Sequence, residues 1–226
     1  MKFTILYEDT HLIVCIKPAG IATQSARLTA ADMVSLLKNH LHQQDSTKGE
    51  PYLAVIHRLD QPVEGILVFA KTPFAAKELS RQLQQDGFGK HYLALLQQAP
   101  KQSEGTLTDY MVKDGKTNTS RICTKDTMGA KKAILEYHIL PRDDSFSGIR
   151  DFSPDFPLAK IRLETGRHHQ IRVQMSHLGC PLVGDQKYNP DYDPLDSRIL
   201  PGRLALFAYR LEFTHPKTGQ KMEFHL

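Results

Sequence analysis

The sequence feature that most constrains the fold is a charged turn followed directly by a strongly apolar run. Residues 57–60 read His-Arg-Leu-Asp, residues 61–65 include a proline and a glycine, and residues 66–70 read Ile-Leu-Val-Phe-Ala. The apolar run predicts a buried strand, and a packed strand holds a reactive group more firmly than a mobile loop does. Asp60, two residues after Arg58 in this turn, is therefore the leading candidate for a reacting residue.

Segments of strand composition elsewhere in the chain are joined mostly by short connections. Short connections favour antiparallel hairpins over repeated β-α-β units. The sequence therefore predicts an α+β fold with a mixed, mainly antiparallel central sheet flanked by helices. The predicted strands cover residues 3–8, 11–16, 90–96, 106–112, 131–140, 158–163, 203–213 and 220–225.

A first helix is predicted between the second strand and the charged turn. Thr29 is the expected N-cap, and Met33, Leu36, Leu37 and Leu41 recur at the three-and-four spacing that buries one face. This helix is expected to give way to a polar loop over residues 43–50.

A second helix is predicted after the apolar run. Thr72 is its expected N-cap, Pro73 lies in its first turn, and Phe74, Leu79 and Leu83 are expected to face inward.

A third helix is predicted from about residue 168 to residue 178. Ile171, Met175 and Leu178 would form its buried stripe, and Arg172 would lie beside that stripe. An arginine in this position either extends along the helix surface or binds a carboxylate or phosphate.

Composition excludes several classes of protein. The chain has 226 residues, enough for one large domain or two small lobes, and 40% of them are hydrophobic. Three widely separated cysteines indicate neither a disulfide framework nor a zinc site, and they favour a reducing cytoplasm. Acidic residues follow closely on the N-terminus, and no apolar run is long enough to span a membrane, so a soluble protein is expected.

Positive charge is concentrated in one segment of the chain. The net charge of the whole chain is +4, which permits an anionic partner without requiring one. Residues 113–132 contain six basic side chains against two aspartates, a local excess of 6 − 2 = 4. This segment is either a solvated hairpin face or a surface for phosphate contacts. The basic residues are Lys113, Lys116, Arg121, Lys125, Lys131 and Lys132, and a second basic group is Lys160, Arg162, Arg167 and Arg172.

Residues 57–60, with Gly65 after them, resemble the catalytic-loop signature H-R-L-D-x-x-T-S-G of the RluA-type pseudouridine synthases. Three further stretches resemble motifs of that family in the same order: residues 17–20 (K-P-x-G), 90–94 (K-x-Y-x-A) and 165–172 (T-G-R-x-H-Q-I-R). One such motif would be weak evidence for the family, whereas four in order at plausible spacing are strong evidence. Together with a tail motif, the resemblance covers essentially the whole chain. The family's L-G-x-P-x-x-G-D-x-x-Y tail is matched by Gly179, Pro181, Gly184, Asp185 and Tyr188.

The resemblance implies an RNA pseudouridine synthase with an active-site cleft across the sheet. In this reaction uracil is detached from ribose, turned, and rejoined through carbon. Three catalytic residues are implied: Asp60 as the essential carboxylate, Tyr92 stacked on the target base, and Arg172 paired with Asp60. Arg167 is the alternative partner for Asp60, and Tyr92 is alternatively an ordinary core tyrosine. The implied substrate-binding residues are His57, Arg58, Arg167, His169 and Gln170. Alternatively, His57 and Arg58 only stabilise the loop through hydrogen bonds and charge pairing.

Elementary chemistry agrees with a catalytic aspartate. A free aspartate has a pKa of about 3.9, so at neutral pH it needs no base to act as a nucleophile or proton acceptor. Whether Asp60 attacks the sugar, attacks the base or removes the sugar C2′ proton is left open. The loop departs from the family signature at Val63 and Glu64, which stand where threonine and serine are usual. The second carboxylate would raise the pKa of Asp60 if the two approached closely.

The implied reaction needs no metal, nucleotide or redox cofactor, and the sequence contains none of the corresponding motifs. His168 and His169 are adjacent, so they are expected to point in different directions and to make a poor metal pair. The expected partner is ribosomal or transfer RNA, without a membrane or metal, and a monomer is expected. We expect one catalytic domain over residues 1–226 without an appended N-terminal RNA-binding module, and a surface loop or insertion over residues 141–157.

Three alternative functions come from other classes. The first is a catalytically impaired RNA-binding protein of the same fold, suggested by the altered loop. The second is a protein kinase, suggested by the likeness of residues 57–60 to H-R-D, but the extra leucine and the missing glycine-rich loop argue against it. The third is a hydrolase that uses Cys15 or Cys180, although a cysteine in an apolar setting usually belongs to the core.

Overall fold

The chain forms two compact units in a computed structural model that describes residues 3–25, 31–45, 49–85, 87–142 and 146–226. The first unit consists of residues 1–89 together with residues 208–226, and the second consists of residues 90–207. The first unit is therefore discontinuous in sequence, whereas the second is one continuous segment.

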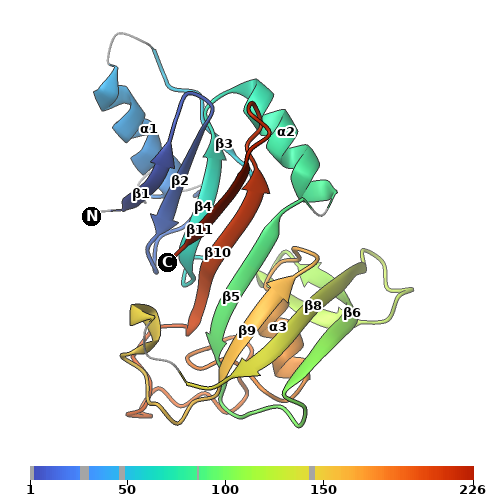
Figure 1. The fold of residues 1–226 in the computed structure, drawn as a ribbon. Helices are drawn as coiled ribbons and strands as arrows, with labels where there is room; N and C mark the ends of the chain where they lie inside the picture. The colour runs from blue at the N-terminus through green and yellow to red at the C-terminus, as the bar shows by residue number, and fades with distance from the viewer. Residues whose placement is uncertain (1–2, 26–30, 46–48, 86, 143–145) are drawn as a thin grey trace. The chain divides into compact units, whose positions relative to one another are not determined.

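The first unit is built on a sheet that joins the two ends of the chain. The strand order is β1-β2-β4-β10-β11, and β3 also pairs with β4. Figure 1 shows the red C-terminal strands β10 and β11 in the same unit as the blue N-terminal strands. The strands are β1 (Thr4–Glu8), β2 (Leu12–Lys17), β3 (Ala54–Val55), β4 (Glu64–Ala70), β10 (Leu206–Thr214) and β11 (Lys221–His225).

Strands β2 and β4 form the centre of this unit. They are antiparallel, with Val14 opposite Val68 and Cys15 opposite Leu67. These four side chains are fully buried although neighbouring positions point to opposite faces, so both faces of the strands are covered. The predicted buried strand after the charged turn is thus confirmed as β4.

Helix α1 (Met33–Gln44) begins at Asp32, whose side chain accepts a hydrogen bond from the backbone N–H of Ser35 at 2.7 Å. The expected N-cap Thr29 lies outside the described residues, and the observed cap is Asp32. Met33 and Leu37 are fully buried, as predicted, and Leu36 and Leu41 are partly exposed.

Helix α2 (Pro73–Gln84) begins as predicted, because the Oγ1 atom of Thr72 accepts a hydrogen bond from the N–H of Ala75 at 3.2 Å. Leu79 is fully buried and Leu83 packs at the edge of the same apolar cluster. The prediction for Phe74 was wrong, since this side chain is 49% exposed. The helical period turns the positions of Ala75 and Leu79 toward the sheet, and this rotates Phe74 outward.

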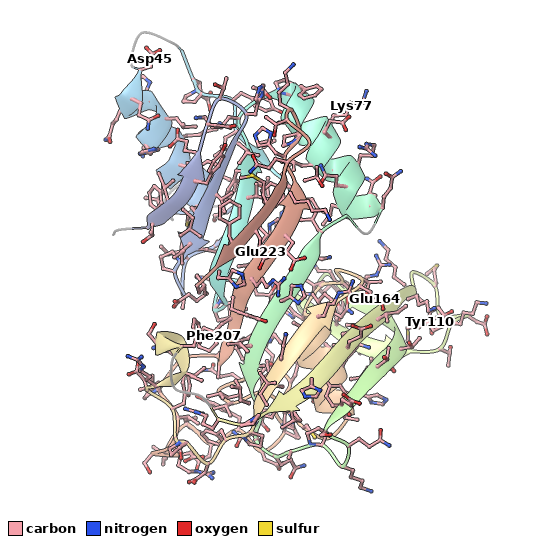
Figure 2. The ribbon with its side chains drawn as sticks, in the orientation of Figure 1. Asp45, Lys77, Tyr110, Glu164, Phe207 and Glu223 are labelled. Carbon is pink, nitrogen blue, oxygen red and sulfur yellow. The ribbon has the colours of Figure 1, made fainter. Side chains whose placement is uncertain are left out.

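The second unit contains an antiparallel sheet of five strands in the order β5-β9-β8-β6-β7. Tyr110, labelled in Figure 2, lies on β6 opposite Lys132 of β8. Strand β7 was not predicted, because its sequence is short and polar. The strands are β5 (Gly89–Leu95), β6 (Glu104–Asp114), β7 (Thr119–Cys123), β8 (Lys131–Leu140) and β9 (Leu158–Leu163).

Helix α3 (Gln170–His177) packs on this second sheet through a small cluster in which Val173 contacts Met111 and Ala133. Ile171 and Met175 are buried, as predicted, but Leu178 follows the helix and is 37% exposed. A helix of only eight residues that is covered on most sides has no single apolar stripe.

Arg172 is itself buried, with 5% of its surface exposed, so it does not extend along the helix surface.

The segment expected to be a surface loop contributes to the core of the second unit. Its described part contains a short 3₁₀ helix, η1 (Ser147–Ile149), and the side chains of Ile149, Phe152 and Phe156 are buried. The predicted class, an α+β fold with a mainly antiparallel sheet and flanking helices, is confirmed.

None of the helices in the described part of the chain combines the length and the hydropathy that a transmembrane helix needs.

Two glycines with similar backbone angles provide a test of the close packing between Gly184 and Arg203. Gly184 has φ +76° and Gly202 has φ +73°, but a Cβ atom on Gly184 would lie 1.9 Å from the carbonyl oxygen of Arg203, whereas one on Gly202 would meet nothing within 4 Å. Both alanine variants bear the left-handed backbone cost of about 1–2 kcal/mol. The free energy of unfolding of Gly184→Ala should fall by about 1–3 kcal/mol more than that of Gly202→Ala, because the backbone carbonyl of Arg203 must move to make room for the methyl group. Urea unfolding of both variants measures this difference in unfolding free energy. Equal losses of stability in the two variants would contradict the prediction.

Candidate active site

Asp60 lies in a turn between β3 and β4 of the first unit, and it is partly exposed. The N–H of Val63 donates to the carbonyl oxygen of Asp60 at 3.0 Å and closes the turn. Gly65 follows with φ +149°, and a Cβ atom there would lie 2.5 Å from the Ala208 carbonyl oxygen. Only glycine lets the chain enter β4 at this close approach.

The turn that carries Asp60 is hydrogen-bonded to residues 17–20, the K-P-A-G segment. The N–H of Gly20 donates to the carbonyl oxygen of Gln61 at 2.8 Å, and the Nε2 atom of Gln61 donates to the carbonyl oxygen of Gly20 at 3.0 Å. The Nζ atom of Lys17 donates to the same Gln61 carbonyl at 3.1 Å. The residue next to Asp60 is therefore fixed by three hydrogen bonds to one short segment.

Thr23 holds the other side of Asp60. Its Oγ1 atom accepts from the N–H of Leu59 at 3.1 Å and donates to the carbonyl oxygen of Leu59 at 3.0 Å. Both residues are buried. Residues 59 and 61 are thus both anchored, which restricts the backbone of the carboxylate between them.

Lys17 is a fully buried lysine at the end of β2. Besides Gln61, its Nζ atom donates to the carbonyl oxygens of Ile21 at 2.7 Å and Pro18 at 3.0 Å. Burial lowers the pKa of Lys17 from its usual 10.5 to about 8, and the negative charges of Asp60 and Glu64 partly oppose this shift. Below pH 8 the Lys17 ammonium is therefore mostly positively charged, and it attracts the carboxylates of Asp60 and Glu64.

Replacement of Lys17 by methionine tests this arrangement. Lys17→Met leaves three carbonyl oxygens without their shared donor, so we expect a loss of about 1–3 kcal/mol of unfolding free energy at pH 7.

The difference should also depend on pH with a defined sign. Between the folded pKa of about 8 and the unfolded value of 10.5, the unfolded wild type binds more protons, so its stability rises with pH relative to the variant. Between pH 7 and pH 9.5, the difference in unfolding free energy between the wild type and Lys17→Met should widen by about 2 kcal/mol, as denaturant unfolding of both proteins measures. A constant or narrowing gap would show that Lys17 does not titrate in this way.

His57 and Arg58, the other predicted residues of the turn, make different contacts. The Nε2 atom of His57 accepts from the N–H of Val68 at 3.4 Å, and its ring meets the edge of Phe88. Arg58 is exposed, and its guanidinium donates to the Oε1 atom of Gln24 at 3.0 Å. His57 therefore supports β4, whereas Arg58 is placed where a ligand can reach it.

The remaining predicted residues belong to the second unit. Tyr92 lies on β5 opposite Ile161 of β9 and is 7% exposed. Arg167 donates from Nε to the carbonyl oxygen of Lys132 at 2.7 Å. The structure thus places Asp60 in one unit and Tyr92, Arg167 and Arg172 in the other, and the predicted pairing of Asp60 with Arg172 or Arg167 stays a prediction.

Arg172 has a strong partner within its own unit. Its Nε and Nη2 atoms donate to the two carboxylate oxygens of Asp185 at 2.8 and 2.6 Å. Sequence reasoning assigned no role to Asp185, although it matched the tail motif. A buried arginine requires a buried acceptor, and this requirement is the signal that identifies the pair.

Gln170 is 2% exposed and joins several parts of the second unit. Its Oε1 atom accepts from the Thr165 hydroxyl at 2.8 Å and from the N–H of Arg167 at 2.9 Å, and its Nε2 atom donates to the carbonyl oxygen of Ile134 at 3.0 Å. These bonds fix the start of α3 on the sheet. Its predicted substrate contact stays a prediction.

The expectation that His168 and His169 point apart was wrong. Their rings stack with centroids 3.7 Å apart and planes inclined by 25°. His169 has φ +56°, a left-handed conformation outside both regular helix and strand, and this brings the two side chains to the same side. Within the part of the chain that the structure describes, no group of three or more histidine, cysteine or acidic residues is arranged to hold a metal ion.

The two reactive-cysteine candidates have raised pKa values. Burial raises the pKa of the Cys15 thiol to about 12 and also raises that of Cys180. A thiol that stays protonated at neutral pH is a poor nucleophile. The hydrolase alternative therefore loses its support.

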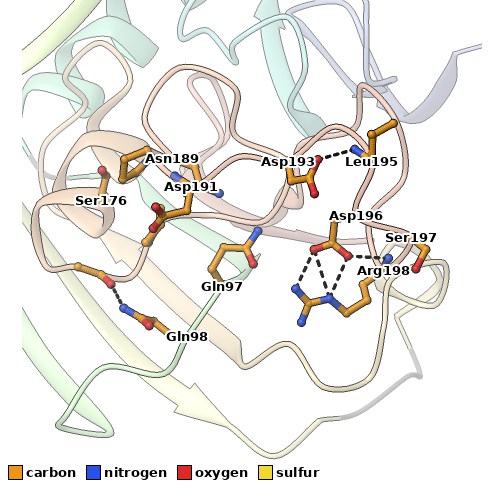
Figure 3. Close-up of a pocket in the computed structure, with 13 residues that line it drawn as sticks. Gln97, Gln98, Ser176, Asn189, Asp191, Asp193, Leu195, Asp196, Ser197 and Arg198 are labelled. Carbon is orange, nitrogen blue, oxygen red and sulfur yellow. Dashed lines mark hydrogen bonds and ion pairs between the residues drawn. The ribbon is translucent and has the colours of Figure 1, made fainter.

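A hollow of about 700 Å³ in the second unit is lined by none of the predicted site residues (Figure 3). Its wall contains Asp191, Asp193 and Asp196, of which Asp196 pairs with Arg198 at 2.7 Å. Three carboxylates against one guanidinium repel phosphate. This hollow is therefore a poor place for RNA.

Comparisons with known proteins agree with the motifs. A family profile described as RNA pseudouridylate synthase matches residues 11–177. A Bacillus subtilis protein named uncharacterized RNA pseudouridine synthase is 33% identical, and the match covers 99% of this chain and 68% of that protein. The tRNA pseudouridine synthase C of Haemophilus ducreyi is 32% identical, with 98% and 89% coverage. The chain spans 59% of ribosomal large subunit pseudouridine synthase D of Nitrosomonas europaea, with 34% identity and 96% of this chain covered.

The fold has a counterpart among solved structures. Human RNA pseudouridylate synthase domain containing 4 superposes with a TM-score of 0.75 and 22% identity, covering 99% of this chain and 87% of the human one. This likeness concerns the fold alone. The profile and the sequence relatives show that the chain belongs to the RNA pseudouridylate synthase family, enzymes that isomerise uridine in RNA, and to its RluA-type branch.

Proposed function

We propose that this protein converts specific uridines of structured ribosomal or transfer RNA to pseudouridine in the cytoplasm, with Asp60 as the essential carboxylate. The observation that carries the proposal is the anchoring of the Asp60 turn. Residues 59 and 61 are bonded to Thr23 and to the K-P-A-G segment, while Asp60 itself stays partly exposed. An exposed carboxylate on a restrained backbone suits a group that must meet a substrate in one orientation.

The departures at Val63 and Glu64 do not loosen this turn. Val63 is 2% exposed and closes the turn through its N–H, so its side chain packs inward where the family usually has a threonine. Glu64 begins β4, and its charge acts on Lys17 beneath the turn. The buried ammonium supplies a positive charge that offsets the added carboxylate. We therefore propose an active enzyme over a catalytically impaired RNA-binding protein.

The proposed roles of the other residues follow the resemblance. Tyr92 would stack on the target base, an interaction worth about 1–3 kcal/mol, and Arg172 would pair with Asp60. Arg58, which is exposed, would enter the space that the flipped uridine vacates or bind a phosphate. These roles stay predictions.

Removal of the carboxylate tests the chemistry directly. Asp60→Asn keeps the size of the side chain but cannot act as a nucleophile or proton acceptor, so pseudouridine formation should fall more than about a thousandfold. RNA affinity should change little. Chemical tagging of pseudouridine, with and without the gene, identifies the target, and the purified variant is then assayed on it.

The matched control is Asp191→Asn, an exposed aspartate of the second unit, which should keep wild-type activity. Full activity in Asp60→Asn would defeat the proposal. RNA binding by the wild type without any pseudouridine would favour the impaired-enzyme alternative.

The basic segment supports RNA as the partner. Lys113, Lys116, Arg121, Lys125, Lys131 and Lys132 are all exposed, over β6, β7, the start of β8 and the turns between them. Arg121 lies opposite Val112, and Lys132 opposite Tyr110, so both project from the same face of the sheet. Exposed cations on one face of a rigid hairpin can follow a phosphate backbone.

Salt dependence tests this surface. If Arg121 and Lys132 each neutralise one phosphate, the double change to glutamine should reduce the slope of log K against log salt by about 1.4 for single-stranded RNA. Binding titrations between low and moderate salt measure it. Lys77→Gln, an exposed lysine on α2 that is labelled in Figure 2, serves as control and should leave the slope unchanged. An unchanged slope in the double variant would exclude this face.

A further inference from the structure

The guanidinium of Arg172 is held by a carboxylate that its own loop fixes in place. Asp185 is fully buried as a side chain, and its Oδ1 atom accepts from the N–H of Lys187 at 2.9 Å and of Tyr188 at 3.2 Å, in addition to Arg172. The preceding Gly184 has φ +76° and lies tightly against Arg203. Backbone contacts of its own loop therefore hold this carboxylate in addition to the arginine.

Tyr188 holds the same guanidinium from another direction. The Cζ atom of Arg172 lies 5.0 Å from the centroid of the Tyr188 ring, within the range of a cation–π interaction. The Tyr188 hydroxyl accepts from the N–H of Ser120 at 2.8 Å, and it contacts the Nδ1 atom of His169 at 2.6 Å. The ring is thus fixed at its outer end by β7 and by the residue that precedes α3.

His169 contributes to this arrangement as a neutral ring. The contact between the Tyr188 hydroxyl and Nδ1 of His169 is compatible with a neutral imidazole, in which one ring nitrogen is a donor and the other an acceptor. Burial, followed by the positive charges of Arg172 and nearby lysines, lowers the pKa of His169 to about 3. Burial together with Lys113, Lys187 and Arg172 lowers that of the stacked His168 to about 4. Neither ring competes as a cation with Arg172.

We infer that Asp185, Tyr188 and His169 are positioning residues that fix the guanidinium of Arg172 for the reaction. This inference rests on the proposed function, in which Arg172 is catalytic. A guanidinium has five N–H groups, and Asp185 uses two of them, on the Nε–Nη2 edge. A guanidinium already held in one plane before the RNA binds needs no reorientation of its side chain during the reaction.

The Asp185→Asn variant separates positioning from the local loop structure. An asparagine keeps Oδ1 to accept from the N–H groups of Lys187 and Tyr188, but its NH₂ group faces a donor of Arg172 instead of accepting from it. We expect kcat on the mapped RNA target to fall about 10–100-fold, as when a residue that supports a catalytic group is changed, with KM and RNA affinity nearly unchanged. Tyr188→Phe, which keeps the ring and loses the bonds to Ser120 and His169, should show a smaller fall in kcat.

Coupling between the two residues gives a result that a merely structural role would not produce. In an Arg172→Lys background, Asp185→Asn should cause little further loss of kcat, because the group to be positioned is already gone. The control is Asp109→Asn. That carboxylate accepts from Gln174 of α3 at 2.7 Å, a contact on the same helix as Arg172 but through a different side chain, so kcat should be unchanged.

A spectroscopic measurement covers the case in which Asp185→Asn folds poorly. The Nε–H resonance of Arg172 in the ¹⁵N NMR spectrum should be protected from exchange in the wild type and in Tyr188→Phe, and unprotected in Asp185→Asn. Losses of kcat that add independently, or that match the fraction of unfolded protein, would overturn the inference, as would an unprotected wild-type resonance. A wild type that forms no pseudouridine would instead overturn the proposed function, and the inference with it.

Discussion

The loop that carries Asp60 depends on one buried ammonium group. Lys17 is fully buried, and its Nζ atom gathers three carbonyl oxygens from two separate segments, residues 18–21 and residue 61. Removing a charge from water costs several kcal/mol, and this cost is offset only if the acceptors converge on it. The lysine therefore specifies the path of both segments. If either one moved, a buried charge would lose part of its solvation.

The two units solve the problem of a buried cation in different ways. In the first, Lys17 is surrounded by neutral carbonyl oxygens, and burial lowers its pKa to about 8. In the second, Arg172 meets the carboxylate of Asp185 with two parallel hydrogen bonds. A compact ammonium suits several converging dipoles, whereas a planar guanidinium suits a bidentate carboxylate, so lysine and arginine are not interchangeable at these two positions.

Much of the fold could be predicted from the sequence because apolar spacing reflects burial directly. Strands β2 and β4 were predicted for that reason, and the cap at Thr72 was predicted from a threonine that directly precedes Pro73. The failures arose where tertiary contacts override local pattern. Phe74 has an apolar side chain but faces outward, and β7 was missed because its polar sequence is stabilised by pairing with β6. The candidate site residues were predicted from motif likeness, but Asp185 and Thr23 act through partners 13 and 36 residues away, which spacing alone does not reveal.

The discontinuous course of the first unit bears on how the protein emerges from the ribosome. Strands β1, β2 and β4 are synthesised early, but β10, which pairs with β4, comes only after the whole of residues 90–205. Until then, the β4 edge that β10 later occupies presents unpaired backbone groups that invite association with other chains. The second unit, by contrast, is one continuous segment that is synthesised without interruption. Completion of the sheet around Asp60 is consequently a late event in the synthesis of the chain.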